Sequence, residues 1–145
     1  MDFADSAGMN FDHFRGLYDD QRIDPVIVCN IERGLADALG ARVTRVLLSS
    51  ETIAKQKVRH PDLSADDYVA LKPAILFGEV RLDGQGRAVI LFVDRHRLAY
   101  GVRVYLKVTG DGRRIYAQSF CLLNEKKYRR ELAKALTVVR EHGQI

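Results

Sequence analysis

A lysine and a histidine that could act together on a phosphate, Lys57 and His60, stand three positions apart in the stretch "SSETIAKQKVRHPDL". A histidine exchanges protons near neutral pH, and a lysine supplies a cation to a phosphate oxygen. The stretch predicts a helix over residues 51–60, and residues three apart are neighbours on a helix surface. On the helical wheel Ile53 and Val58 mark the inward arc, and Lys57 lies within that arc.

Burying an ammonium group is costly unless it is paired or faces a polar cleft. We therefore predict that Lys57 and His60 share a face that meets a cleft, whereas Lys55 and Arg59 point into solvent. In the alternative, Lys57 extends past apolar neighbours to reach water, and His60 only caps the helix C-terminus, where a cation is favourable. The wheel alone leaves both interpretations open.

A later stretch, "GVRVYLKVT", alternates apolar residues with Arg103, Tyr105, Lys107 and Thr109. This period of two predicts a strand with one apolar face and one basic, aromatic face. Such a face suits nucleic acid, because cations meet phosphates and tyrosines stack on bases. The alternative is an ordinary solvated sheet face.

The next strand, "RIYAQSFCLL", predicts Ala117, Ser119 and Cys121 on one face and Phe120 on the other. Ser119 is a small hydroxyl residue that could donate a hydrogen bond to a phosphate. These two strands form a hairpin around the turn signal "GDG". The hairpin therefore supplies the second half of the candidate site.

The elements that must position these residues follow from periodicity and turn signals. Residues 1–24 form an acidic, partly flexible lead-in, and residues 25–143 form a single domain. We expect helices over residues 30–40, 51–60, 63–75 and 125–142, and strands over residues 25–30, 42–49, 79–82, 88–93, 101–109 and 114–123. The predicted class is α+β, with N-terminal helices packed on a four-stranded antiparallel β-meander and a closing C-terminal helix.

Size and composition limit the possible classes. The chain has 145 residues, of which 47% are hydrophobic and 29% charged, which is typical of one globular domain. No apolar run approaches transmembrane length and no signal peptide is visible, so we expect no membrane association. The two cysteines, Cys29 and Cys121, favour a reduced, cytoplasmic protein, with a disulfide as the lesser alternative.

The charge is unevenly distributed along the chain. Residues 1–24 hold six Asp and two Arg, net −4, which leaves 21 basic and 13 acidic residues, net +8, in the remainder. A basic body suggests a polyanionic partner. The phosphate-loop, dinucleotide-binding, HExxH and CxxC motifs are all absent, and the four histidines lack ligand spacing. We therefore expect no metal and no cofactor.

The run "VLLSSETIAKQKVRHPDLSADDYVALKPAI", followed by "LFV", "YLKVTGDGRRIYAQSF" and "NEKK", resembles the phage-associated branch of the barnase–EndoU–colicin–RelE-like (BECR) nucleases. The resemblance covers residues 31–127. It lies in a serine-led helix with "K" and "HP", a following "DY", and a meander with "K-x-T" and a late serine. The Lys57-x-x-His60 spacing is also similar to the active-site helix of colicin D-type tRNA-cleaving toxins.

The resemblance implies a metal-independent endoribonuclease that cleaves RNA, with tRNA as one substrate class and an antitoxin or immunity protein as a partner. It implies catalytic roles for His60, Lys57, Lys107 and Ser119. His60 would transfer protons, the two lysines would neutralise the phosphate, and Ser119 would hold a non-bridging oxygen. The second proton-transfer group stays open. One alternative is a catalytically inactive phage or toxin-system module that binds nucleic acid or protein. Another is a structural phage-particle or regulatory protein with no nucleic-acid role.

The remaining residues of the hairpin strand are expected to bind the substrate. Thr109 would hold a phosphate oxygen, as the resemblance implies, while Arg103 and Tyr105 belong to the basic, aromatic face. The acidic lead-in interleaves Asp with Phe3, Phe14 and Tyr18, so it is expected to lie over or near that face and limit RNA access. The alternative is a solvated tail.

Overall fold

The computed structural model describes residues 10–20, 24–93 and 100–143. Helices and strands alternate in its first half, and a run of strands follows. In chain order the elements are α2 (Phe11–Asp20), β1 (Val26–Asn30), α3 (Arg33–Ala38), β2 (Arg45–Leu48), α4 (Ser50–Arg59), the 3₁₀-helix η1 (Ala65–Ala70), α5 (Leu71–Phe77), β3 (Glu79–Leu82), β4 (Arg87–Phe92), β5 (Gly101–Val108), β6 (Ile115–Leu123), α6 (Glu125–Leu132) and β7 (Thr137–Arg140).

All the strands of the described residues join one sheet, in the order β1-β2-β6-β5-β4-β3-β7. The pairing of β2 with β6 is parallel, and every other neighbouring pair is antiparallel. The α+β mixture was expected, but the four-stranded antiparallel meander was wrong. The meander β3–β6 is the centre of a seven-stranded mixed sheet, because β1 and β2 extend it at one edge and β7 at the other.

The single closing helix was also wrong. Asn124 caps α6 as expected, since its side chain accepts a hydrogen bond from the Lys127 backbone N–H at 2.8 Å, but the helix ends at Leu132. The segment beyond it becomes β7, which pairs with the otherwise open edge of β3. Its β-branched residues Thr137, Val138 and Val139 favour a strand once such a partner edge exists.

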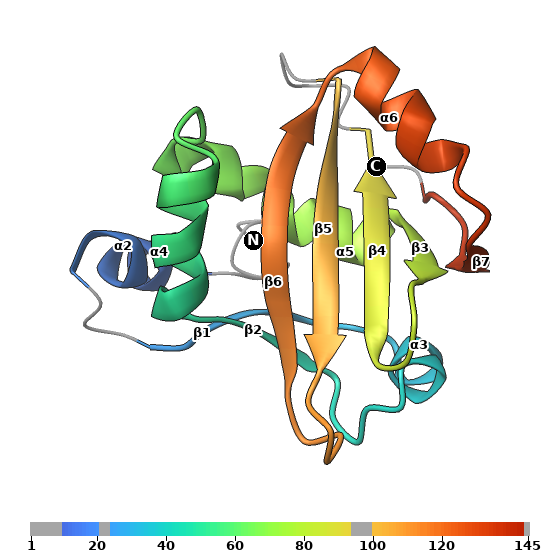
Figure 1. Ribbon diagram of the computed structural model, residues 1–145. Coiled ribbons are helices and arrows are strands. Elements are labelled where there is room, and N and C mark those ends of the chain that lie inside the picture. The colour runs from blue at the N-terminus through green and yellow to red at the C-terminus, as the bar shows by residue number, and fades with distance from the viewer. Residues whose placement is uncertain (1–9, 21–23, 94–99, 144–145) are drawn as a thin grey trace.

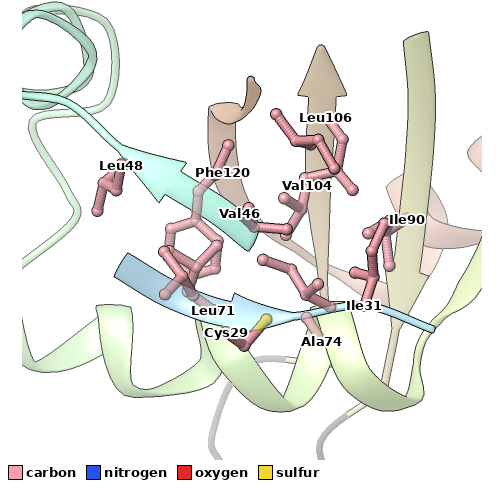
Figure 2. Close-up of a cluster of buried hydrophobic side chains, with 14 of the residues drawn as sticks. Cys29, Ile31, Val46, Leu48, Leu71, Ala74, Ile90, Val104, Leu106 and Phe120 are labelled. Atoms are coloured by element: carbon pink, nitrogen blue, oxygen red, sulfur yellow. The ribbon is translucent and has the colours of Figure 1, made fainter. Parts of the chain in front are cut away.

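The main core lies on the inner face of the sheet, where η1 and α5 pack. Figure 1 shows α5 behind the central strands, and Figure 2 shows side chains from both β1–β2 and the meander meeting over this helix. The residues labelled there are Cys29, Ile31, Val46, Leu48, Leu71, Ala74, Ile90, Val104, Leu106 and Phe120. One continuous apolar layer therefore joins the N-terminal strands to the meander.

The outer face of the sheet is divided. At one end α6 packs on a small second cluster formed by Val89, Leu91, Cys121, Leu123 and Tyr128. Over the rest of their length β4, β5 and β6 carry no described helix on this face (Figure 1). Lys107 of β5 lies on the uncovered part, Arg103 lies beside α6, and Tyr105 lies between them.

Helix α2, in the predicted lead-in, belongs to the core. Phe14 and Leu17 are fully buried, and the Phe14 ring packs 5.0 Å from the Tyr68 ring. The helix packs on α4 and β1, so residues 11–20 do not lie over the basic sheet face as expected. Phe3, named in the same expectation, lies outside the described residues.

The burial of α2 predicts a large stability effect for one residue. Phe14→Ala should lower the free energy of unfolding by about 3–5 kcal/mol, the usual cost of truncating a buried phenylalanine. Arg15→Ala, at an exposed position of the same helix, should change it by less than about 0.5 kcal/mol. Urea denaturation followed by circular dichroism measures both. Equal midpoints for the two variants would show that α2 is not part of the cooperative core.

Candidate nucleic-acid interface

Helix α4 presents a different face to the core than its hydrophobicity indicates. The Ser49 hydroxyl caps its start, accepting a hydrogen bond from the Thr52 N–H at 3.2 Å. The side chains buried on the protein are Ile53 and Gln56, whereas Val58 is 80% exposed. The expected inward arc was therefore wrong, because the buried face of α4 is rotated away from Val58 and toward Gln56.

Gln56 explains this rotation. Its side-chain amide donates to the Phe120 carbonyl of β6. At this point β6 has no strand on the α4 side, because β2 pairs only with Ile115 and Tyr116. A buried carbonyl without a partner is costly, so a polar side chain at this position is favoured over an apolar one.

Lys57 points away from the sheet and contacts α2. Its ammonium group donates to the Tyr18 carbonyl at 2.7 Å and lies 4.1 Å from the centre of the Tyr18 ring. The position of the Lys57 cation is favourable for two reasons. It lies in the last turn of α4, where the helix dipole favours positive charge, and it lies over an aromatic ring, which attracts a cation. In this structure Lys57 links α4 to α2.

A β-bulge in the β5–β6 hairpin determines which side chains reach the outer face. Tyr105 pairs with Ser119, but Leu106 pairs with Ala117, so Gln118 is an extra residue. Ala117 turns into the core and is 2% exposed, while Ser119 joins Tyr105 on the outer face. The expectation that Ala117 and Ser119 share a face was wrong for this reason.

Tyr105 lies at the centre of a cationic cluster on the outer face. The Arg103 and Arg87 guanidinium carbons lie 5.0 Å and 5.6 Å from the centre of its ring. Arg87 pairs across the sheet with Lys107, which in turn pairs with Tyr116. Tyr105 and Lys107 are half-buried, so each offers part of its surface to a ligand. We call Arg87, Arg103, Tyr105 and Lys107 the Tyr105 cluster.

A pocket of about 340 Å³ lies beside this cluster, between the end of α4, the sheet and α6. Its lining includes His60 at the C-cap of α4 with the nearby Asp62, Arg103 and Cys121 of the sheet, and Lys127, Arg130 and Glu131 of α6. We call it the His60 pocket. It brings together two of the predicted site residues, His60 and Arg103, with two further cations.

Glu131 fixes the charge arrangement in the His60 pocket. Its carboxylate accepts from Arg103 at 2.6 Å and pairs with Lys134 at 3.0 Å. Burial raises the pKa of Glu131, but Lys134 and Arg103 lower it more, so the net pKa is below the usual 4.5. Burial raises the pKa of the Cys121 thiol, which favours a packing role over nucleophilic chemistry.

The predicted site residues thus lie in several places. Lys57 of α4 contacts α2, His60 and Arg103 share the pocket, and Ser119 lies on the outer face with Tyr105 and Lys107. Thr109 holds the β5–β6 turn, because its hydroxyl donates to Asp111 at 2.7 Å and accepts from the Arg114 N–H at 3.1 Å.

Sequence reasoning missed four residues that the structure adds to this interface: Arg87, Lys127, Arg130 and Glu131. Three of them could have been found, because Lys127, Arg130 and Glu131 recur at the helical spacing of one face of α6. Arg87 carried no signal, since its contact with Tyr105 depends on the register between β4 and β5.

Comparisons with protein-family models, with curated proteins and with solved structures find no match to this chain. The resemblance to BECR nucleases therefore stays a prediction. In residues 10–20, 24–93 and 100–143 no group of three or more His, Cys, Asp or Glu could hold a metal ion. No helix in the same ranges is long and apolar enough to span a membrane.

The pairing of Glu131 predicts a pH dependence of stability. Since its folded-state pKa is lower than the unfolded value near 4.5, the ionised carboxylate stabilises the protein above that pH. This contribution is lost as the pH falls through the folded-state pKa. Chemical denaturation from neutral to acidic pH should show Glu131→Gln less stable than wild type at neutral pH, with the difference shrinking in acid.

Glu125→Gln is the control. It breaks an exposed pair with Arg129 and should show little difference from wild type at any pH. A pH-independent difference for Glu131→Gln would contradict the pairing.

Proposed function

We propose that this protein binds single-stranded RNA across the outer face of its sheet. The main support is the Tyr105 ring, which lies between the guanidinium groups of Arg87 and Arg103. It lies on a sheet face that the described helices leave largely uncovered (Figure 1). Bases stack on aromatic rings and on guanidinium planes, and the cations meet the phosphate backbone. Tyr116, opposite Lys107, supplies a second aromatic ring along the same strands.

One feature of the cluster favours a ligand over simple solvation. Arg103 is held in place by Glu131, so its guanidinium group is already ordered before any ligand arrives. Preordering reduces the entropy lost on binding.

A second candidate function, metal-independent RNA cleavage, is favoured by the His60 pocket. His60 lines this pocket with Arg103, Lys127 and Arg130. A histidine can transfer a proton to or from a ribose oxygen, and cations can stabilise charge that develops on the phosphate. Glu131 lines the same pocket, and its pairing with Arg103 suits it to orienting that cation.

Binding is the first proposal because it needs only the outer face. Cleavage needs two proton-transfer groups near one phosphate, and the second of them is still unassigned. Lys57, which was expected to neutralise the phosphate beside His60, contacts Tyr18 instead. A cytoplasmic location, where RNA and reduced thiols occur together, is part of the proposal. A tRNA substrate, a phage or toxin system and a cognate inhibitor stay predictions from the resemblance.

The binding proposal predicts that Tyr105→Ala weakens affinity for single-stranded RNA about 5- to 150-fold, the scale of about 1–3 kcal/mol for one stacked base. Lys107→Ala should reduce the slope of log affinity against log salt by about one unit, since one phosphate contact is lost. Fluorescence anisotropy with a labelled oligonucleotide of about 12 nucleotides measures both.

Lys55→Ala is the matched lysine control, because Lys55 is exposed on α4 and pairs with Glu51 at 3.1 Å. It should bind RNA like the wild-type protein. Wild-type affinity in a folded Tyr105→Ala variant, or RNA affinity that does not respond to salt, would contradict the proposal.

The cleavage proposal predicts RNA, but not DNA, degradation in EDTA, with 2′,3′-cyclic or 3′-phosphate ends. His60→Ala should slow it by about a hundredfold or more while RNA affinity is retained. His13→Ala, an exposed histidine on α2, is the matched control, and Lys57→Ala should leave the rate largely unchanged. Gel analysis of end-labelled RNA gives the rates. A requirement for divalent metal, or His60→Ala activity equal to wild type, would exclude this cleavage mechanism. Neither result would contradict the RNA-binding proposal.

A further inference from the structure

A second basic pocket, larger than the His60 pocket, lies where β1, α3 and β2 meet the β5–β6 turn. Its volume is about 700 Å³, within the range of small-molecule sites. Its lining includes five arginines from three separate segments of the chain, Arg33, Arg42, Arg45, Arg113 and Arg114. We call it the arginine pocket. None of its residues belongs to the Tyr105 cluster or to the His60 pocket.

The backbone around this pocket is fixed in place. The Arg42 N–H donates to the Gly112 carbonyl at 2.7 Å, which docks the β5–β6 turn on the loop before β2. Gly112 has a φ of 74°, and a Cβ there would lie only 2.9 Å from the Gly40 carbonyl oxygen. Only glycine fits this close approach. The docked turn carries Arg113 and Arg114 to the arginines of the other segments.

The charge of the pocket is only partly compensated. Its lining, as described, contains no Asp or Glu. Asp37 lies 4.0 Å from Arg33 across an exposed pair, and Asp111 accepts from the Arg113 backbone N–H at 3.0 Å. Like charges repel, so gathering five guanidinium groups around one pocket favours an anionic ligand.

The number of arginines points to a ligand with more than one phosphate. A single phosphate group carries about 1.5 to 2 negative charges near neutral pH. That is less than the three positive charges that remain when Asp37 and Asp111 are subtracted from the five arginines. Arginine is also suited to phosphate, because its planar fork can donate two parallel hydrogen bonds. Two or three linked phosphates would match the arginines better.

The rest of the lining is apolar and suits a flat ring. Ile27, on the outer face of β1, is 48% exposed, and it lines the pocket together with Val43 and Leu47. Exposed apolar side chains next to cations provide a surface for a base beside a site for its phosphates. At the edge of the pocket the Thr44 hydroxyl donates to the Asn30 side-chain oxygen at 3.0 Å, which leaves the Asn30 amide group to donate to a ligand.

We propose that the arginine pocket binds a nucleotide that carries two or more phosphates, with its base on the apolar side and its phosphates among the arginines. The nucleotide is either free or the 5′-phosphorylated end of an RNA strand, since both present the same chemistry. This site is separate from the RNA-binding face, so each can fail without the other.

Titration with fluorescently labelled ATP tests the proposal, with unlabelled ATP, ADP, AMP and adenosine as competitors. ATP and ADP should compete at least about tenfold better than AMP, a difference of about 1.4 kcal/mol. The double variant Arg45→Ala/Arg113→Ala, at two exposed positions, should weaken ATP binding by at least the same factor. The matched control is Arg59→Ala/Arg129→Ala, two exposed arginines outside both pockets, which should bind ATP like wild type.

Two RNA arms identify the source of the nucleotide. If RNA with a 5′-triphosphate binds more tightly than the same RNA with a 5′-hydroxyl, and the arginine double variant abolishes the difference, the pocket takes an RNA end. If ATP binds and the two RNAs do not differ, it takes a free nucleotide. Tyr105→Ala should leave ATP binding unchanged, which separates this site from the RNA-binding face.

Several outcomes would overturn the proposal. They are the absence of saturable binding by both ATP and 5′-triphosphate RNA, equal ATP affinity in the arginine double variant, and AMP competing as well as ATP. Equal displacement of ATP by a poly-glutamate peptide would also overturn it, because the pocket would then select carboxylates and not phosphates. Circular dichroism of each variant establishes that it is folded before its binding is compared.

Discussion

The short parallel pairing of β2 with β6 is the contact on which the rest of this structure depends. It involves two residue pairs, Val46 with Ile115 and Leu47 with Tyr116. Through it the N-terminal strands join the meander, and their inner faces form one core with α5 (Figure 2). Beyond these pairs β2 leaves β6, and the backbone edge that remains would be a site for unwanted strand pairing. Helix α4 covers that edge, with Gln56 bonded to the Phe120 carbonyl.

This arrangement also sets where the two pockets lie. At the end of β6 where β2 pairs, the outer face of β2 and the docked β5–β6 turn bring the arginines together. At the opposite end, the C-cap of α4 brings His60 against Arg103 and α6. The bulge at Gln118 lies between them and keeps Ser119 and Cys121 on the outer face, while Phe120 stays in the core. A shift of one residue would exchange these faces.

The sequence predicted the elements that depend on local signals. The four meander strands follow from their apolar residues and from glycine turns, with a clear period of two in β5, and the ends of α4 follow from Ser49 and Pro61. It did not predict β7, because Leu136 and Val139 continue the helical period of α6 and only the open edge of β3 makes this segment a strand. Nor did it predict the buried face of α4, since a hydrophobic wheel favours Val58, whereas the Phe120 carbonyl requires the amide of Gln56. The structure of residues 137–140 and the buried face of α4 depend on contacts with strands that are distant in the sequence. Local sequence patterns do not predict such contacts.

The same limit applies to the candidate sites. Residue types indicated a basic, aromatic face on β5, and the structure adds Arg87 from the neighbouring strand to Tyr105. The arginine pocket had no sequence signal, because its residues come from three segments that only the β2–β6 pairing and the docked turn bring together. Arg114 is the link between the two surfaces, since its guanidinium group donates to the Tyr116 hydroxyl at 3.1 Å and Tyr116 pairs with Lys107. The two surfaces therefore adjoin at Tyr116, although each is made of its own residues.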